Sequence, residues 1–256
     1  MIRTALTTVA LIIGTLIAGL AAVARWLGIP DRRGGLYDII PQIWARLLLG
    51  AAGVRVIKHG TVPLDDLAPR VYVSNHVSWF DIPSAIRVLW PFGFVAKREL
   101  ERYPVFGAAA RALHVIFIDR ENRKAAFSAY EDAAAKIRAG QSVLVFPEGT
   151  RGRDYAVRPF KKGPFVLAIG SGAPIVPVVI HGTIAVNPRG KFRAGPGTVH
   201  VHVLDPIPTE GLTYDDRSAL ADQVRQRMAE CLQSVYGVTP LPAGRGTSAE
   251  PAEVTD

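Results

Sequence analysis

Two kinds of apolar pattern alternate along the middle of the chain. Short apolar runs bounded by glycine, proline or polar residues have the length and composition of buried strands. They lie at Val54 to Lys58, Val71 to Ser74, Gly93 to Ala96, Val115 to Ile118, Ser142 to Phe146, Ile175 to Ile180 and Val199 to Val203. Helical periodicity marks Glu121 to Arg138, before Gly140, and Tyr214 to Tyr236, before Gly237. The alternation predicts an α/β sheet with helices on its faces.

The N-terminal part of the chain has a different pattern, an unbroken apolar stretch. Ala5 to Ala24 is a run of 20 uncharged residues, and as a helix it would span about 30 Å, the hydrocarbon thickness of a bilayer. Only Arg3 precedes this stretch, whereas three arginines follow it by residue 33, so the positive-inside rule predicts a cytoplasmic domain after it. A signal peptide cleaved after Ala24 is the alternative, although the stretch is longer than such segments usually are.

A second helical pattern follows a Pro/Gly break. Its apolar positions are Ile40, Ile43, Trp44, Leu47, Leu48 and Ala51. This amphipathic helix lies either on a lipid surface or against the core, and the pattern leaves both open. At the other end, the composition from Pro240 to Asp256 is typical of a disordered tail. We therefore divide the chain into membrane-anchoring helices (1–53), an α/β domain (54–237) and a disordered tail (238–256).

The segment Asn75-His76-Val77-Ser78-Trp79-Phe80-Asp81 follows one predicted strand and carries candidate chemistry. Residues five apart in a helix lie about 140° apart around its axis, so His76 and Asp81 must meet across a turn. A carboxylate that binds one ring nitrogen of a histidine fixes its tautomer, and the other nitrogen then accepts a proton. Alternatively, His76 bonds only the loop backbone while Asp81 caps a helix. Ser78 is a candidate N-cap of that helix.

Three other strand ends also carry polar groups. Phe146-Pro147-Glu148-Gly149-Thr150-Arg151 forms a turn after a strand, and Phe117-Ile118-Asp119-Arg120 ends another strand in a cation. Taken alone, the first turn could equally be a surface loop with a solvated ion pair. The third, Ile175 to Ile180, contains Pro177, which favours an edge or bulge position because proline cannot donate to a sheet.

These segments together resemble the glycerolipid acyltransferase family, which includes the 1-acyl-sn-glycerol-3-phosphate acyltransferases. The four ordered blocks of that family match the Asn75 to Asp81, Phe117 to Arg120, Phe146 to Arg151 and Pro177 segments, and Lys97 and Phe160 to Gly163 match as well. Two positions depart from the pattern: His114 stands where glycine is frequent, and Gly152 where serine is common. The fold implied is α/β, a single mixed sheet flanked by helices, preceded by an N-terminal membrane-anchoring helical segment.

The resemblance implies transfer of an acyl group from acyl-CoA or acyl-carrier protein to the 2-hydroxyl of 1-acyl-sn-glycerol 3-phosphate. It implies that His76 is the general base and that Asp81 orients it. Substrate-binding roles are implied for Lys97, Arg120, Glu148, Gly149, Thr150 and Arg151. The cations would neutralise the acceptor phosphate, while Glu148 would bond the glycerol or hold Arg151. No cofactor and no metal site are expected, and the implied location is the cytoplasmic face of the inner membrane.

Composition agrees with these expectations. A net charge of +8 and a pI of about 9.9 suit contact with membrane lipid, coenzyme A phosphates or an acidic carrier. No basic run interleaved with aromatics indicates nucleic acid as a partner. The single cysteine, Cys231, excludes an intramolecular disulfide and fits packing on a helix. The remaining strand-end histidines, His59, His181, His200 and His202, are predicted to be solvated.

Three other functions remain alternatives. An acyltransferase for another lyso-lipid, such as lyso-ornithine lipid or lysophosphatidylglycerol, is the main one. A hydrolase that uses His76 to activate a serine or water is less favoured, because the chain lacks a Gly-x-Ser-x-Gly elbow. A noncatalytic membrane-binding protein would not require a base with its orienting carboxylate.

Overall fold

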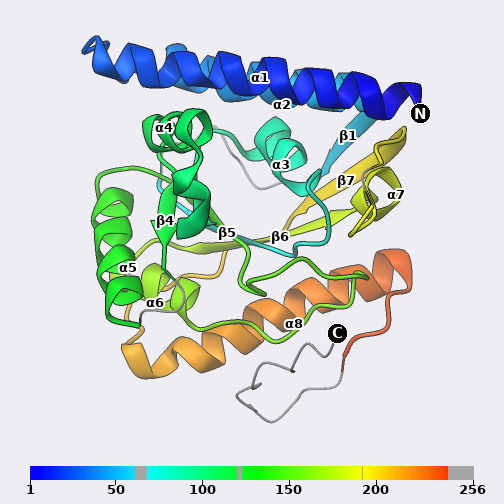
Figure 1. Cartoon of the computed structure of the whole chain (residues 1–256). Helices are drawn as coiled ribbons and strands as arrows, with labels where there is room; N and C mark the ends of the chain where they lie inside the picture. The colour runs from blue at the N-terminus through cyan, green and yellow to red at the C-terminus, as the bar shows by residue number, and fades with distance from the viewer. Residues whose placement is uncertain (61–67, 120–122, 192, 242–256) are drawn as a thin grey trace, which may run out of the picture.

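The sheet organises the whole molecule (Figure 1). The computed structural model describes residues 1–60, 68–119, 123–191 and 193–241, and they contain one seven-stranded sheet of order β1-β7-β6-β2-β5-β3-β4. Its strands are β1 (Val54–His59), β2 (Val71–Ser74), β3 (Gly93–Lys97), β4 (Ile116–Ile118), β5 (Val143–Val145), β6 (Ile175–His181) and β7 (Gly197–Val203). Only β6 and β7 pair antiparallel, and the other neighbours pair parallel. The predicted mixed α/β sheet is confirmed.

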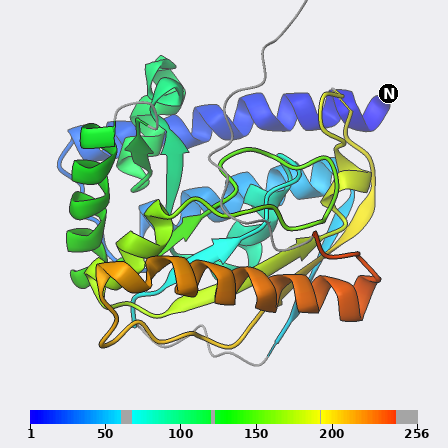
Figure 2. The same ribbon diagram turned by 90° about the horizontal axis from the view of Figure 1, so that it is seen from below.

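Helices cover both faces of this sheet. They are α1 (Ile2–Trp26), α2 (Leu36–Ala52), α3 (Asp81–Leu89), α4 (Pro104–Ala112), α5 (Arg123–Arg138), α6 (Gly163–Ser171), α7 (Thr183–Val186) and α8 (Arg217–Tyr236), with short 3-10 helices η1 (Arg98–Arg102) and η2 (Tyr214–Asp216). One core cluster joins the sheet to α5, α6 and α8, and the other joins it to α2 and α3. Seen from below, α8 runs across its face of the sheet (Figure 2). Mostly parallel strands are apolar on both sides because both sides are buried.

The predicted elements match the structure to within one or two residues where they are described. The long C-terminal helix differs, since Tyr214–Asp216 is a separate 3-10 turn and α8 begins at Arg217. Residues 120–122, at the start of the predicted helix before Gly140, lie outside the described residues, as do residues 242–256 of the predicted tail.

The predicted position of Pro177 was wrong. Strand β6 lies inside the sheet, between β2 and β7, rather than at an edge. The Pro177 carbonyl accepts from the Leu204 amide at 3.0 Å, one residue beyond the end of β7. The nitrogen and the carbonyl of one strand residue face the same neighbour, so the donor that proline lacks would face Leu204, one residue beyond the paired residues Val178 and Val203. The missing hydrogen bond therefore lies at the end of the β6–β7 ladder rather than inside it.

The N-terminal apolar stretch forms the predicted helix, and α1 is the one helix in the described residues that is long and apolar enough to cross a membrane. It lies along α2 and α4 (Figure 1). Its small residues Ala10, Gly14, Ala21 and Ala24 are buried, whereas large apolar residues such as Leu16 and Leu20 are exposed.

The sequence left open whether helix α2 lies on a lipid surface or packs against the core. Ile40, Leu48 and Leu49 pack inward, while Ile39 and Ile43 stay exposed. One face of α2 therefore packs on the rest of the protein, and the other adds to the apolar surface of α1.

Candidate active site

The carboxyl ends of the parallel strands β2, β5, β3 and β4 meet at one edge of the sheet, where open α/β sheets bind ligands. His76 lies in the loop between β2 and α3, and α3 begins at Asp81. The two side chains meet, with His76 Nδ1 and Asp81 Oδ2 at 2.7 Å. Because a carboxylate has no proton to donate, Nδ1–H donates and Nε2 keeps its lone pair.

Asp81 also holds the turn that brings it to His76. Its Oδ2 accepts from the backbone amides of Val77 at 2.7 Å and Ser78 at 2.8 Å. The alternative that His76 bonds only the loop backbone while Asp81 caps a helix is wrong: the imidazole bonds Asp81, and no side chain caps α3. One carboxylate thus orients the imidazole and binds the amides before α3. Asp81 is fully buried, whereas the His76 side chain is 17% exposed. The imidazole of His76 is thus accessible to solvent, whereas the Asp81 carboxylate that orients it is not.

Ser78 does not cap α3, contrary to the prediction. Phe80 precedes the helix, and no side chain caps it. The Ser78 hydroxyl instead donates to the Asn187 carbonyl at 2.9 Å and accepts from the Phe80 amide at 3.3 Å. It joins the loop to the segment after α7, and the helix begins three residues after Ser78, at Asp81.

Asn75 fixes the loop from the other side. Its side-chain amide donates to the Ile180 carbonyl at 2.9 Å and its side-chain oxygen accepts from the Ile180 amide at 2.8 Å. This two-point contact anchors the loop to β6. The Phe146 ring stacks on His76, with ring centroids 4.1 Å apart. Both contacts restrict the imidazole to one orientation.

Glu148 supports His76 through the backbone. Its Oε1 accepts from the His76 amide at 3.2 Å. Burial raises the pKa of Glu148 to about 7, although the His76 amide and the Arg158 charge oppose that shift. No hydrogen bond or ion pair joins Glu148 to Arg151 among the described residues, so the predicted alternative that Glu148 holds Arg151 is not seen.

The cation of the same turn faces outward. The Arg151 guanidinium lies over the Trp79 ring, 4.9 Å from its centroid, and Arg189 Nη1 donates to the Arg151 carbonyl. Burial, and then the charge of Arg189, lower the pKa of Arg151, while the charge of Asp81 opposes that shift. Thr150 is exposed beside it. An anion bound here would be attracted by the charges of both Arg151 and Arg189.

The remaining predicted site residues are Lys97, Gly149 and Arg120, and the first two have no described contact with His76 or Asp81. Lys97 ends β3, two strands from β2, and its Nζ forms an ion pair with Glu99 at 2.9 Å. Gly149 has φ +78 and lies against the Lys161 side chain, so its backbone conformation by itself requires glycine. Arg120 lies outside the described residues.

Thr183 is the residue that the sequence did not indicate. At the start of α7, its hydroxyl donates to Asp81 Oδ1 at 2.6 Å. The two residues are 102 positions apart, so no local spacing could have linked them. The only available signal was that Thr183 lies two residues after the strand of the proline block, which ends at His181.

Comparison with known proteins agrees with this geometry. Residues 55–181 match the family model described as Acyltransferase. The chain belongs to this family. It is 38% identical over 187 residues to the Caenorhabditis elegans protein named putative 1-acyl-sn-glycerol-3-phosphate acyltransferase acl-2, covering 72% of this chain and 66% of that one. It is 39% identical over 186 residues to the human 1-acyl-sn-glycerol-3-phosphate acyltransferase alpha, covering 72% and 65%.

A plant relative and a solved structure extend this comparison. The Limnanthes douglasii 1-acyl-sn-glycerol-3-phosphate acyltransferase is 37% identical over 195 residues, covering 74% of this chain and 66% of that one. The chain thus spans just under two thirds of the length of these curated relatives. The crystal structure of the Thermotoga maritima enzyme PlsC, described as a 1-acyl-sn-glycerophosphate acyltransferase, matches with a TM-score of 0.70 at 23% identity. That match covers 92% of this chain and all of the other, and it confirms the fold.

The structure shows the surroundings of both positions at which this chain departs from the family pattern. His114 has φ +64, and no other non-glycine residue described has a positive φ, so it stands where glycine is the easier residue. At Gly152, an added Cβ would lie 2.6 Å from Arg158 Nη1 and 2.9 Å from the Asp154 carbonyl oxygen. A serine at this position would therefore require the loop to shift.

The prediction that the other strand-end histidines are solvated was wrong for His202, which is 9% exposed. Its Nε2 lies 2.6 Å from the Tyr236 hydroxyl, and its ring stacks on the ring of His59. His59 Nε2 in turn lies 2.8 Å from His200 Nδ1. The His181 ring stacks on Tyr236. Burial first, and then the neighbouring histidines, lower the pKa of His202 to about 4. We call His59, His181, His200 and His202 the histidine cluster. Strands β1, β6 and β7 bring them together, and Tyr236, the last residue of α8, contacts the rings of His181, His200 and His202.

Proposed function

We propose that this protein transfers a fatty acyl group from a thioester to the 2-hydroxyl of 1-acyl-sn-glycerol 3-phosphate, giving phosphatidic acid. The observation that carries this proposal is the bond between His76 Nδ1 and buried Asp81, which leaves Nε2 as a base on a partly exposed ring. Acyl-CoA or acyl-carrier protein is the donor. The names of the relatives support the acceptor, and the outward-facing Arg151 supports an anionic group on it.

The reaction follows from the orientation of the imidazole. His76 Nε2 takes the proton from the acceptor hydroxyl while its oxygen attacks the thioester carbonyl carbon. Asp81 stabilises the imidazolium that forms. The tetrahedral intermediate then expels the thiolate, the C–S bond breaks, and the imidazolium returns the proton to sulfur. The products are a new ester and a free thiol, with the base regenerated.

The test is an assay of purified protein with a panel of lyso-lipid acceptors and both donor types. We expect ester formation that requires a thioester together with 1-acyl-sn-glycerol 3-phosphate. Faster turnover with lyso-ornithine lipid or lysophosphatidylglycerol would replace the proposed acceptor. Thioester or ester cleavage without an acceptor would favour a hydrolase.

Arg151 is proposed to bind the acceptor phosphate. Changing Arg151 to Ala should raise the KM for the acceptor by roughly 10-fold or more, since hydrogen bonds to charged groups contribute about 1.5–3 kcal/mol. Arg153→Ala, an exposed change two residues away, is the matched control and should leave that KM unchanged. An Arg151 variant that raises only the donor KM would assign this side chain to the thioester carrier.

We also propose that the protein resides at the inner membrane with its catalytic domain on the cytoplasmic face. The exposed apolar side chains of α1 and α2 support bilayer contact. Mass spectrometry should find an uncleaved N-terminus, and only protease added from the cytoplasmic side should digest the domain. Deleting residues through Ala24 should weaken membrane binding. Cleavage after Ala24 would identify a signal peptide instead.

A further inference from the structure

We propose that Thr183 is a positioning residue for the catalytic pair and acts through Asp81. The inference rests on the proposed function of His76 as the base. Asp81 Oδ2 already accepts from His76, Val77 and Ser78. The donor that reaches Oδ1 is the Thr183 hydroxyl, at 2.6 Å.

Both partners of this bond are completely buried. A buried carboxylate oxygen without a donor is unfavourable, so loss of the hydroxyl would favour rotation of the carboxylate toward other partners. Such rotation weakens the bond from Oδ2 to His76 Nδ1. Thr183 therefore selects the carboxylate orientation in which a single oxygen serves both the imidazole and the turn.

Thr183 is itself held in place by a second loop. The Tyr155 hydroxyl accepts from the amides of Gly182 at 2.8 Å and Ile184 at 3.0 Å, one on each side of Thr183. Tyr155 follows the turn that carries Glu148 and Arg151. The loop predicted to bind substrate and the carboxylate that orients the base are thus joined through the start of α7.

The first test is the isosteric change Thr183→Val, with Thr183→Ser as the conservative control. We expect kcat to fall by roughly 10- to 100-fold in the valine variant, the range of one unsatisfied buried acceptor. The acceptor and donor KM values should change little, because a buried side chain cannot touch the substrate. Serine should restore most of kcat. If valine prevents folding, judged by thermal unfolding, Thr183→Ala replaces it.

A double-mutant cycle with Asp81→Ala separates positioning from a general structural effect. Without Asp81, loss of the Thr183 hydroxyl should cost little further activity, since coupled residues are non-additive. Full additivity, a normal kcat in the valine variant, or a raised KM alone would each overturn the inference. If His76→Ala remains active, the proposed function fails instead. An inactive His76→Ala variant beside a normal Thr183→Val variant would refute only the positioning role.

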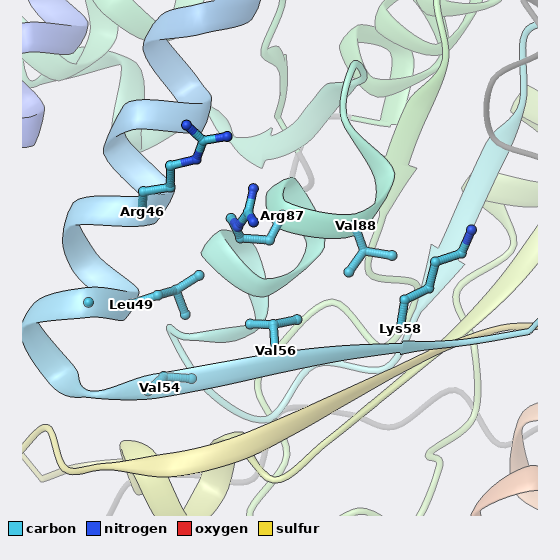
Figure 3. A pocket seen from close by; sticks show the side chains of 8 residues that line it. Arg46, Leu49, Val54, Val56, Lys58, Arg87 and Val88 are labelled. Carbon is cyan, nitrogen blue, oxygen red and sulfur yellow. The ribbon is translucent and has the colours of Figure 1, made fainter.

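A different observation supports a second site. A pocket of about 440 Å³ opens between α2, β1 and α3, lined by Arg46, Lys58 and Arg87 above an apolar floor. The floor consists of Leu49, Val54, Val56 and Val88 (Figure 3). No acidic residue lines it. Among the described residues, Arg46 and Lys58 have neither hydrogen bond nor ion pair, and Arg87 donates to Gln42 at 3.2 Å.

We infer that this pocket binds an anionic phospholipid from the membrane that α1 and α2 contact. Three cations line the pocket without an acidic neighbour in the lining and complement a phosphodiester, and the apolar floor complements the adjoining glycerol and acyl carbons. Exposed Ile43 and Leu47 flank Arg46 on the same helix, so the pocket lies beside the surface proposed to face lipid. This inference depends on that membrane contact for its source of ligand.

The probe is dihexanoyl-phosphatidylglycerol below its micelle concentration, with the phosphatidylcholine analogue for comparison, measured by calorimetry. The wild type should bind only the anionic lipid. The double variant Arg46→Gln/Lys58→Gln should lose roughly 10-fold or more in affinity. The matched control Lys136→Gln/Arg227→Gln removes two exposed charges elsewhere and should not change binding.

Equal loss in the control variant would show non-specific charge attraction and overturn the site. Inorganic phosphate that competes as well as the lipid would identify a free phosphate as the ligand, and equal binding of the choline lipid would also refute the inference. Sedimentation of the wild type with neutral vesicles tests membrane contact by α1 and α2 separately. The two experiments can therefore give different answers: membrane contact by α1 and α2 can be confirmed while lipid binding in the pocket is refuted, or the reverse.

Discussion

His76, in the loop after β2, and the histidine cluster, on strands β1, β6 and β7, belong to the same sheet domain but differ in the partners of their rings. His76 has a buried carboxylate at one nitrogen and an accessible edge. The cluster offers His202 only other imidazoles and Tyr236, and its burial lowers the pKa of His202 to about 4. A carboxylate lets an imidazole accept a proton during catalysis, whereas neighbouring imidazoles and burial oppose a charge.

The two regions should also respond to pH in opposite directions. Beside His76, burial raises the pKa of the Glu148 carboxyl to about 7. In the histidine cluster, burial lowers the pKa values of His181, His200 and His202. In both regions the neutral form is favoured, but rising pH charges the acid and falling pH charges the bases.

The comparison is tested most strongly by removing one imidazole from each region. His76→Ala should reduce kcat by about 10²- to 10⁴-fold, the usual contribution of a general base. His200→Ala, in the cluster, should change kcat by less than about threefold, because the described contacts of this side chain are with His59 and Tyr236 and not with His76, Asp81 or Thr183. Steady-state assays measure kcat for both variants, and thermal unfolding shows whether each variant is folded. Similar losses in both variants would show that the cluster takes part in catalysis.

Glu148→Gln should change the pH dependence of stability near the site. Glu148 has a reference pKa of 4.5 and a folded pKa of about 7, so its stabilising effect is complete below pH 4.5 and is lost as pH rises through 7. Glutamine stays neutral. Between pH 4.5 and 8 the wild type should lose roughly 3 kcal/mol of unfolding free energy relative to the variant. Urea titrations at both pH values measure this difference, and a constant difference would contradict the shifted pKa.

His202→Gln should have the smallest effect, with the opposite sign. The folded pKa of His202, about 4, lies below its reference value of 6.5, so its stabilising effect is present above pH 6.5 and is lost as pH falls toward 4. Glutamine does not titrate. The thermal midpoint of the variant should therefore fall less than that of the wild type between pH 7.5 and 5. An equal fall in both proteins would remove His202 from the acid response.

The amino-acid sequence by itself determined what depends on near neighbours. Apolar periodicity located the described strands, and the short turn between β2 and α3 made the contact of His76 with Asp81 predictable. Only the tertiary structure decided the order of the strands. That order places Thr183 against Asp81, Phe146 against His76, and histidines from three strands together at the end of α8.

The same reason explains the predictions that were wrong. Proline was expected at an edge or a bulge because it cannot donate to a sheet, and the sequence does not show that Pro177 lies at the end of the pairing of β6 with β7. His202 was expected in solvent because Tyr236, at the end of α8, comes later in the chain. Periodicity reports which face of an element is apolar within a few residues. What covers that face is set by the packing of distant segments, since the burial of apolar surface has no preferred sequence separation.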